Sequence, residues 1–371
     1  MRNSRDGNQR IGTRGPLRRR LWAVADSLAS PRDPSHYLDM FHPLRRGADL
    51  RARVVEVRPE AQDAVTVVLR PGAAWRSHIP GQYVRVGIDV DGVRRWRSYS
   101  VTSAPTGASS AAAESTISVT AKAVPGGLVS AHLSQHLQPG DLVHLTQACG
   151  TFVLPDPAPR RTLFITAGSG ITPVVGMLRS GLDRLDDAVL VHSDRSPGDV
   201  LFGDELRALA AAGRLRLFEN HTDVQGRLDT AGLAALVPDL TERQTWACGP
   251  AGLLDALEEH WAALGIDDQL HTERFQTKRA EPGEGGTVRF ASTGAELVAD
   301  GATSLLDVGE QAGLLLPSGC RIGICFSCVL PLREGAVRDL RTGDVTTAAP
   351  GDGVVIQTCV SAAAGTCDVD F

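Results

Sequence analysis

Four cysteines late in the chain limit its fold more than any other feature of its 371 residues. Cys320, Cys325 and Cys328 follow the spacing C-x4-C-x2-C, and thirty residues separate Cys328 from Cys359. This spacing is typical of a 2Fe–2S cluster, in which four thiolates bind two irons. Zinc is the main alternative, although zinc sites more often have two C-x2-C pairs or mix cysteine with histidine. Unrelated core cysteines are the other alternative. We predict that these cysteines form a loop around a 2Fe–2S cluster.

The composition excludes several classes of protein. Hydrophobic residues make up 42% of the chain and charged residues 22%, so the chain can bury cores, and its length suits two or three domains. We find no apolar run long enough to span a membrane and no secretory signal, so we expect a cytoplasmic protein with reduced cysteines. Only two of the 38 basic residues are lysines, a bias that GC-rich coding explains, so we expect no nucleic-acid partner.

A basic arm precedes the rest of the chain. Residues 1–46 carry ten arginines and four aspartates, a net charge of +6 in a chain whose total is −5. Directly after Arg20, the apolar Leu21, Val24 and Leu28 fall on one stripe of a helix. A basic amphipathic segment is compatible with peripheral contact with an anionic membrane, here the inner face of the plasma membrane. Packing against the neighbouring domain and a solvated tail are the alternatives.

Two loose segments divide the remainder of the chain. Pro155–Arg160 holds three prolines, and Thr277–Gly286 is rich in glycine, glutamate and proline, as is typical of domain boundaries. After the arm at 1–46, we therefore expect domains at residues 47–157, 158–276 and 287–371, with a linker at 277–286.

The first of these domains has the pattern of short strands separated by turns. One helix-like run, Leu128–Leu137, interrupts the strands. Six short strands with a single helix predict an antiparallel β-barrel. The expected strands are Arg51–Val57, Ala64–Leu69, Tyr83–Val90, Val93–Thr102, Thr116–Ala121 and Leu142–Gln147.

In the second domain, apolar strands alternate with helical runs. This alternation is that of βαβ units and predicts a parallel sheet covered by helices. The expected strand–helix pairs are Thr162–Thr166 with Pro173–Arg179, Ala188–His192 with Phe202–Ala211, Arg214–Phe218 with Asp229–Leu236, and Gln244–Ala247 with Leu253–Leu264.

The third domain contains the four cysteines and is expected to be a small α+β unit. Two strands precede a helix, the cysteine loop follows, and two strands come after it. The expected elements are Thr287–Phe290, Ala295–Ala299, the helix Ser304–Ala312, Val329–Leu332 and Val354–Cys359.

A glycine-rich turn follows the first strand of the parallel-sheet domain. The segment from Thr166 to Pro173 reads TAGSGITP, with glycines at Gly168 and Gly170. Glycines let the backbone approach a phosphate, the N-terminus of a helix favours the anion, and proline suits the first helical turn. We predict a nucleotide-phosphate site here; a structural glycine turn is the alternative.

A second candidate site lies at the end of a barrel strand. Arg97 can pair with a phosphate, Tyr99 can stack on an aromatic ring, and Ser100 can hydrogen-bond a ring nitrogen. The alternative for Tyr99 is a half-buried barrel aromatic. A second anion-binding turn is predicted at Gly126-Gly127-Leu128-Val129-Ser130.

Together these motifs resemble those of the ferredoxin–NADP reductase superfamily, in the subgroup with a C-terminal plant-type ferredoxin domain. The resemblance covers residues 47–371 and implies a FAD-binding barrel, a pyridine-nucleotide α/β domain and a β-grasp 2Fe–2S domain, hence an NAD(P)H-dependent oxidoreductase. The matching motifs are R-x-Y-S at Arg97, Tyr99 and Ser100, G-x-x-S at Gly127 and Ser130, G-x-G-x-x-P at Gly168, Gly170 and Pro173, and C-G-P at Cys248, Gly249 and Pro250.

The resemblance also implies roles for single residues. Arg97, with Ser98 beside it, holds the FAD diphosphate, Tyr99 packs on the isoalloxazine, and Ser100 reaches flavin N5. The turn Gly127–Ser130 donates N–H groups to the same diphosphate.

For hydride transfer, the resemblance places Cys248 near the nicotinamide C4, although a small residue at a strand end is the alternative. The segment His271–Phe275 resembles the end of the reductase module, so Glu273 and Phe275 are expected to face the flavin ring. Ser100, Cys248 and Glu273 are the predicted catalytic residues.

The choice of pyridine nucleotide depends on residues after the second strand of this domain. Arg195, beside Ser193, can clamp the 2′-phosphate of NADPH. Asp194 can instead accept from the 2′-hydroxyl of NADH. The segment HSDRSPGDVLF resembles that of NADPH-using relatives, so we expect NADPH, with NADH as the alternative.

The expected electron path runs from NADPH through FAD and the cluster to a protein acceptor. Residues 286–371 carry five arginines and ten carboxylates, which favours a basic partner. The segments 21–43 and 91–100 resemble those of actinobacterial reductases that supply acyl-CoA (stearoyl-type) desaturases, which are membrane-bound di-iron enzymes. A fatty-acyl desaturase is therefore the first expected acceptor. A ring-hydroxylating oxygenase, an alkane hydroxylase and a cytochrome P450 are alternatives, and a redox sensor without steady turnover is an alternative of another class.

Overall fold

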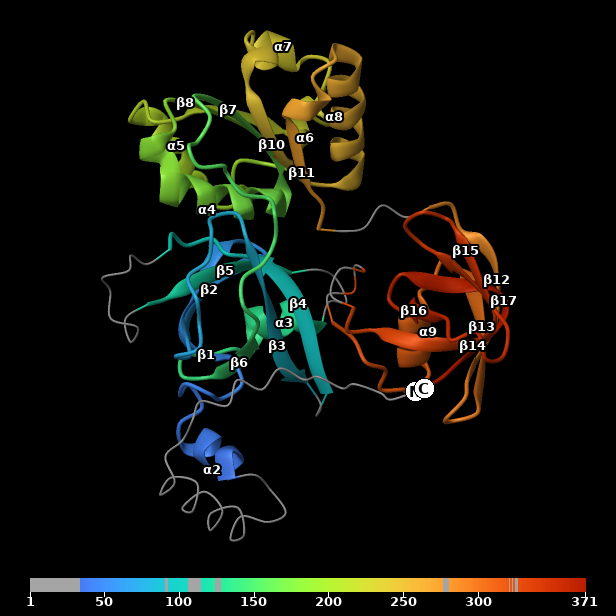
Figure 1. Ribbon diagram of the computed structural model, residues 1–371. Coiled ribbons are helices and arrows are strands. Elements are labelled where there is room, and N and C mark those ends of the chain that lie inside the picture. The colour runs from blue at the N-terminus through green and yellow to red at the C-terminus, as the bar shows by residue number, and fades with distance from the viewer. Residues whose placement is uncertain are drawn as a thin grey trace.

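The computed structural model describes residues 34–90, 93–105, 115–123, 128–275, 280–319, 321, 323 and 326–371. It contains three sheets, each with its own core. Figure 1 shows the antiparallel sheet of β1–β6 below the parallel sheet of β7–β11, with the C-terminal sheet of β12–β17 at its right. The predicted order of a barrel, an α/β domain and a small α+β domain is confirmed.

The first sheet is the predicted antiparallel barrel. Its strand order is β4-β3-β6-β1-β2-β5, and a bridge between Val101 and Val119 joins the end of β4 to β5. The helix α3 (Leu128–Gln135) buries Val129 and Leu133 against the barrel core. The strands are β1 Arg51–Ala61, β2 Ala64–Pro71, β3 Tyr83–Val90, β4 Val93–Ser100, β5 Ile117–Lys122 and β6 Leu142–Leu145.

A short helix, α2 (Pro34–Phe41), precedes the barrel and leaves the side chains of Met40 and Phe41 exposed. The predicted apolar stripe Leu21–Leu28 lies outside the described residues. Among the described residues, no helix combines the length and the apolar character needed to cross a bilayer.

The second sheet is entirely parallel, with the order β11-β10-β7-β8-β9. Successive side chains of β7 point to opposite faces of the sheet. Phe164 packs in the core on the side of α4 and α5, whereas Leu163 and Ile165 pack in the core on the side of α8. The strands are β7 Arg161–Ala167, β8 Asp187–Asp194, β9 Arg216–His221, β10 Gln244–Cys248 and β11 Leu270–Glu273. The helices are α4 Ile171–Gly181, α5 Gly203–Ala211, α6 Thr222–Gln225, α7 Leu233–Leu236 and α8 Ala251–Leu264.

One predicted helix of this domain is wrong over half its length. The expected helix Asp229–Leu236 is reduced to α7, which begins at Leu233. The Asp229 carboxylate accepts a hydrogen bond from the Ala231 N–H (3.0 Å). This local bond stabilises a turn in competition with the first helical turn.

The third sheet is mixed and has the order β13-β12-β17-β14-β15, with β16 paired to β14. Helix α9 (Leu305–Gln311) lies against it, and the Ser304 hydroxyl caps α9 by accepting from the Asp307 N–H (3.1 Å). The strands are β12 Gly283–Phe290, β13 Ala295–Gly301, β14 Val329–Asp339, β15 Val345–Ala348, β16 Val355–Gln357 and β17 Ser361–Val369.

The central strand of this sheet, β17, was not predicted. Its sequence SAAAGTCDV is rich in alanine and contains a glycine, which are residues of low strand propensity. A side chain at Gly286 of the parallel neighbour β12 would meet the Gly365 carbonyl at 1.9 Å, so the two strands approach too closely for larger residues. The expected strand Val354–Cys359 is also shorter, because β16 ends at Gln357.

Candidate functional site

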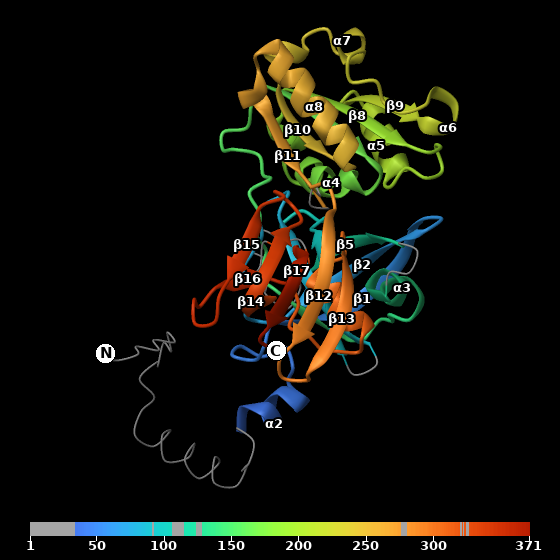
Figure 2. The same cartoon turned by 90° about the vertical axis from the view of Figure 1, so that its right-hand side faces the viewer.

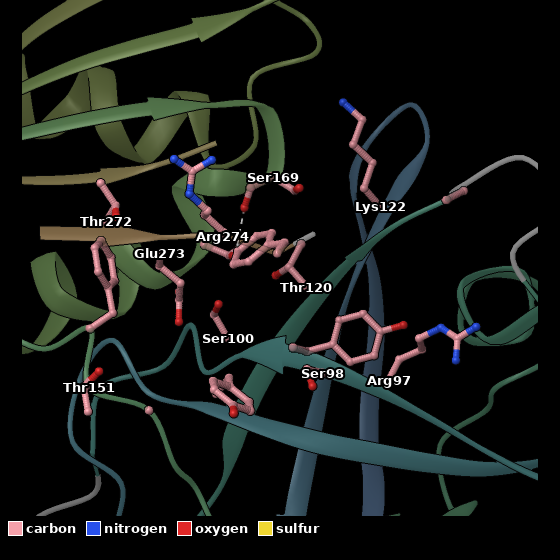
Figure 3. A pocket seen from close by; sticks show the side chains of 17 residues that line it. Arg97, Ser98, Ser100, Thr120, Lys122, Thr151, Ser169, Thr272, Glu273 and Arg274 are labelled. Atoms are coloured by element: carbon pink, nitrogen blue, oxygen red, sulfur yellow. Dashed lines mark hydrogen bonds between the residues drawn. The ribbon is translucent and has the colours of Figure 1, made fainter. Parts of the chain in front are cut away.

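A pocket of about 700 Å³ lies between the barrel and the carboxyl ends of the parallel strands (Figure 3). Ligands of open parallel sheets bind at this edge. Arg179 of α4 donates a hydrogen bond to the Thr102 carbonyl of the barrel (2.8 Å) and so joins the two walls. Among the predicted site residues, the pocket brings together Arg97, Ser98, Tyr99, Ser100, Glu273 and Phe275.

Strand β4 supplies the barrel side of the pocket. Because side chains alternate along a strand, Arg97 and Tyr99 share one face. Tyr99 is half-buried against the barrel core, and burial raises the pKa of its hydroxyl to about 12. The phenol therefore stays neutral at physiological pH and offers an aromatic face to a ligand.

Among the described residues, no carboxylate forms an ion pair with Arg97. Burial and then the nearby Arg321 lower the pKa of its guanidinium. Its guanidinium donates a hydrogen bond to the neutral Trp96 carbonyl (2.8 Å), whereas Arg95 and Arg321 are paired with carboxylates. A partly desolvated cation of this kind fits an anionic ligand such as a diphosphate.

Three polar side-chain atoms in the pocket are buried and have no hydrogen-bond partner among the described residues: Ser98 Oγ, Ser100 Oγ and Glu273 Oε2. Buried polar groups are normally paired, so these atoms favour a polar ligand that completes their bonding. A flavin ring has the required mixture of an apolar face and polar edges. The residues present therefore fit the FAD that the motifs imply.

Gly170 lets the glycine turn approach the end of β10. A Cβ at this position would lie 2.1 Å from the Cys248 carbonyl oxygen, which only glycine avoids. Gly168 has a positive φ of 54°, and Pro173 occupies the first turn of α4 as expected. The structure thus brings the predicted nucleotide turn beside Cys248.

Cys248 and Glu273 are directly opposite each other in the register of β10 and β11. Burial raises the pKa of Glu273 to about 8. Burial, and secondly the charge of Glu273, raises the pKa of the Cys248 thiol well above its usual value. At neutral pH both groups are therefore protonated, and this wall of the pocket carries no negative charge. The neighbouring Gly249 and Pro250 connect β10 to α8.

Asp194 and Arg195 at the end of β8 have different surroundings. Asp194 is buried, with its carboxylate 3.8 Å from His192 Nε2. Burial opposes its ionisation, but His192 and the Arg195 N–H outweigh burial and lower the pKa of the carboxyl. The Arg195 side chain is 58% exposed and pairs with Asp199 at 2.6 Å. Ser193 Oγ, beside them, accepts a hydrogen bond from Asn220 (3.0 Å).

Sequence reasoning missed Lys122, which lines the same pocket from the barrel side. Its Nζ lies 3.7 Å from Asp63 and 3.9 Å from Asp194, so it links the barrel to β8. Its rarity could have drawn attention to it, because the chain has only two lysines.

Part of the second predicted turn lies outside the described residues, namely Gly126 and Gly127. Leu128 begins α3, and Val129 and Ser130 are buried in its first turn. Thr166 is buried near the C-terminal end of β7, where its hydroxyl oxygen lies 2.8 Å from His192 Nδ1.

Two of the four predicted cluster ligands, Cys320 and Cys325, lie outside the described residues. The other two converge: the sulfurs of Cys328 and Cys359 are buried and 3.2 Å apart. The Thr358 hydroxyl and N–H both donate to the Cys328 carbonyl and fix this pair. The convergence fits the predicted ligand set.

The loop around these cysteines has an unusual backbone. Arg321 and Phe326 have positive φ angles of 61° and 55°, which is rare for residues other than glycine. Arg341 and Gln357 both donate to the Gly323 carbonyl, at 3.2 and 2.9 Å, and so hold the loop. Phe326 is 67% exposed, so its side chain is directed toward solvent.

Comparison with known proteins identifies three kinds of domain in the chain. Three family models match: an oxidoreductase FAD-binding domain at residues 69–154, an oxidoreductase NAD-binding domain at 164–259, and a 2Fe-2S iron-sulfur cluster binding domain at 288–364. The matches confirm the predicted cofactors FAD, NAD(P)H and a 2Fe–2S cluster.

Several curated proteins resemble the chain over most of its length. An NADPH oxidoreductase of Mycobacterium tuberculosis is 48% identical over 356 residues, covering 95% of this chain and 92% of that protein. The ferredoxin reductase component of 3-ketosteroid-9-alpha-monooxygenase of Mycolicibacterium smegmatis is 31% identical over 315 residues, covering 78% and 87%. Among solved structures, phthalate dioxygenase reductase aligns with a TM-score of 0.59 at 22% identity, covering 86% of this chain and 97% of that one, and it shows the same fold.

Proposed function

Because the chain belongs to the ferredoxin-reductase type of NAD(P)H-dependent oxidoreductases, with FAD-binding, NAD-binding and 2Fe–2S domains, we propose that it oxidises NADPH and supplies electrons to a separate iron-containing oxidative enzyme. The observation that carries the proposal is the pocket between β4 and the carboxyl ends of β10 and β11. There the barrel motif and the Cys248–Glu273 pair face each other. Electron transfer from NAD(P)H to the cluster through FAD is the activity of this family.

Bound FAD would supply the chemistry that links the two-electron pyridine nucleotide to the one-electron cluster. The protein positions the reactants and controls charge around them. We assign Ser100 Oγ as the hydrogen-bond donor toward flavin N5, because it is buried and lacks another partner among the described residues. Tyr99 would pack on the ring, and Phe275 lines the same pocket.

Glu273 and Cys248 keep the hydride-transfer side of the pocket neutral. Glu273 holds its proton up to about pH 8, and the Cys248 thiol holds its own to higher pH. A carboxylate at this position would repel the negative charge that a flavin gains on reduction. We therefore assign to Glu273 the role of keeping a proton, rather than a charge, beside the ring.

NADPH is the proposed electron donor. Arg195 is exposed at the edge of the sheet, where it can exchange its Asp199 contact for a 2′-phosphate. Asp194 is the residue that would bind the 2′-hydroxyl of NADH, but it is buried and engaged by His192 and Lys122. A comparison of kcat/KM for the two nucleotides tests this assignment, and equal values would contradict it.

The four cysteines Cys320, Cys325, Cys328 and Cys359 are the proposed cluster ligands. Replacing Cys359 by serine should remove most of the visible cluster absorbance, whereas replacing Cys149, which is exposed and distant in sequence, should leave it intact. A full cluster spectrum in the Cys359→Ser variant would contradict the ligand set.

Two observations bear on the identity of the electron acceptor: the names of related proteins and the resemblance of two sequence segments. Relatives named as reductase components of monooxygenases favour an oxygenase-type acceptor. The resemblance of segments 21–43 and 91–100 favours a membrane fatty-acyl desaturase, and the exposed Met40 and Phe41 of α2 are consistent with contact at a membrane surface. We retain the desaturase as the finer proposal, with an oxygenase, an alkane hydroxylase and a cytochrome P450 as its competitors.

Reconstitution distinguishes these acceptors. The protein, NADPH and one acceptor of each class are combined, and product is measured with each. Desaturation without hydroxylation supports the desaturase, and the reverse result assigns the chain to an oxygenase or a P450. A cofactor-binding sensor would reduce neither these acceptors nor cytochrome c at a steady rate.

A further inference from the structure

A second pocket, of about 480 Å³, lies where the barrel meets the C-terminal domain. Its barrel wall includes Arg95, Arg97 and Val129, and its opposite wall includes Thr303 and Glu310. Figure 1 shows α9 on the side of the C-terminal domain that faces β4 and α3. The volume falls within the range of about 300–1,000 Å³ that is common for small-molecule sites.

The two pockets share Arg97 and follow one another along β4. Tyr99, Arg97 and Arg95 lie on the same face of the strand, and same-face neighbours are about 7 Å apart. Figure 3 shows Arg97 on the side of the first pocket away from Glu273 and Thr272. An elongated ligand with its ring at Tyr99 and a phosphate at Arg97 would therefore continue toward Arg95.

The charges around the second pocket suit the nucleotide part of such a ligand. Arg95 Nη1 lies 2.8 Å from Glu310 Oε1, and Arg321 pairs with the same carboxylate and with Asp307. Three arginines, counting Arg97, face two carboxylates, so one positive charge remains for an anion. The carboxylates are acceptors for hydroxyl groups, the role that acidic residues have at the ribose of bound dinucleotides.

We infer that this second pocket takes the adenylate half of FAD, so that the C-terminal domain forms one wall of the flavin site. The inference rests on the proposed placement of the FAD diphosphate at Arg97. It implies that the protein distinguishes FAD from FMN through Thr303, Glu310 and their neighbours, which belong to the cluster domain. It also implies that FAD contacts both the barrel and the cluster domain, the two domains between which electrons pass.

The test compares FAD with FMN, which has the ring and one phosphate but no adenylate. Deflavinated protein that retains its cluster is titrated with each flavin, and quenching of flavin fluorescence gives the dissociation constants. Thr303→Trp and Gln311→Trp each place a large side chain at the wall of the second pocket. We expect each to weaken FAD binding at least about tenfold and FMN binding less than about twofold.

The matched control is Val298→Trp, which adds the same side chain at a 90% exposed position of β13 and should change neither affinity. Visible circular dichroism of the cluster verifies that the C-terminal domain is folded in each variant. Equal weakening of both flavins, or unchanged FAD binding in both folded variants, would overturn the inference.

Arg97→Gln tests the premise separately. It should weaken FMN and FAD alike, because both place a phosphate at Arg97. If neither affinity changes, the proposed diphosphate site is wrong. If both fall while the tryptophan variants bind FAD normally, the proposed function stands and only the adenylate pocket is refuted.

Discussion

Glu273 should make the stability of this protein fall as the pH rises toward 8. Burial raises its pKa from the usual 4.5 to about 8 in the folded protein. The unfolded chain therefore loses this proton near pH 4.5, whereas the native protein keeps it to about pH 8. Between these values unfolding releases a proton, so increasing pH favours the unfolded state. The stabilisation is complete below pH 4.5 and is lost as the pH passes through 8.

The size of the effect follows from the pKa difference. A difference of about 3.5 pKa units corresponds to about 5 kcal/mol over the whole interval, and each pH unit inside it changes the free energy of unfolding by about 1.4 kcal/mol. Between pH 6 and pH 7.5 the contribution of Glu273 should fall by about 2 kcal/mol. Glu273→Gln removes the ionisable group while keeping the shape and polarity of the side chain.

Urea unfolding of the deflavinated protein, measured at several pH values for both proteins, provides the assay. The difference between wild type and Glu273→Gln isolates one group, because all other titrating residues are shared. The control Glu259→Gln removes an exposed carboxylate from α8 and should retain the wild-type slope. Parallel pH profiles for wild type and Glu273→Gln would show that Glu273 is ionised in the native protein and would refute the reasoning.

Three further predictions concern other parts of the molecule. Arg195→Ala should lower kcat/KM for NADPH by about 10–100-fold and leave NADH within about threefold, since a charged hydrogen bond contributes about 1.5–3 kcal/mol; an unchanged preference would refute the 2′-phosphate assignment. Gly170→Ala places a Cβ 2.1 Å from the Cys248 carbonyl, so NADPH-driven flavin reduction should fall at least about tenfold, whereas Gly252→Ala, where space is open, should be tolerated. Glu310→Gln weakens the ion pair with Arg95 that joins the cluster domain to the barrel, so reduction of the cluster in the FAD-saturated protein, followed by stopped-flow absorbance, should slow and lose sensitivity to salt; an unchanged rate and salt dependence would show that this ion pair does not hold the two domains in position for electron transfer.

The local parts of the site were predictable because their residues are adjacent in sequence. Arg97, Tyr99 and Ser100 occupy one strand, and strand alternation determines which faces they share. The Gly170 turn and the Cys248 strand end were each recognisable from a few residues. In the structure they meet because neighbouring parallel strands end at the same edge of the sheet.

Contacts between domains were not predictable in this way. Glu310 pairs with Arg95 across 215 positions of sequence, and neither residue belongs to a recognisable motif. Lys122 approaches Asp194 only because the barrel and the parallel sheet pack together. The missed strand β17 has weak intrinsic strand propensity, and its pairing on both sides with β12 and β14 stabilises it.

The position of β17 has a consequence for how the protein is made. This strand lies between β12 and β14 but is synthesised after both, and Cys359 lies two positions before its first residue. During translation the barrel and the nucleotide domain can fold while the C-terminal sheet still lacks its middle strand. The four cysteines are therefore all available only after the barrel and the nucleotide domain have been synthesised, so the iron–sulfur cluster cannot guide the start of folding in those two domains.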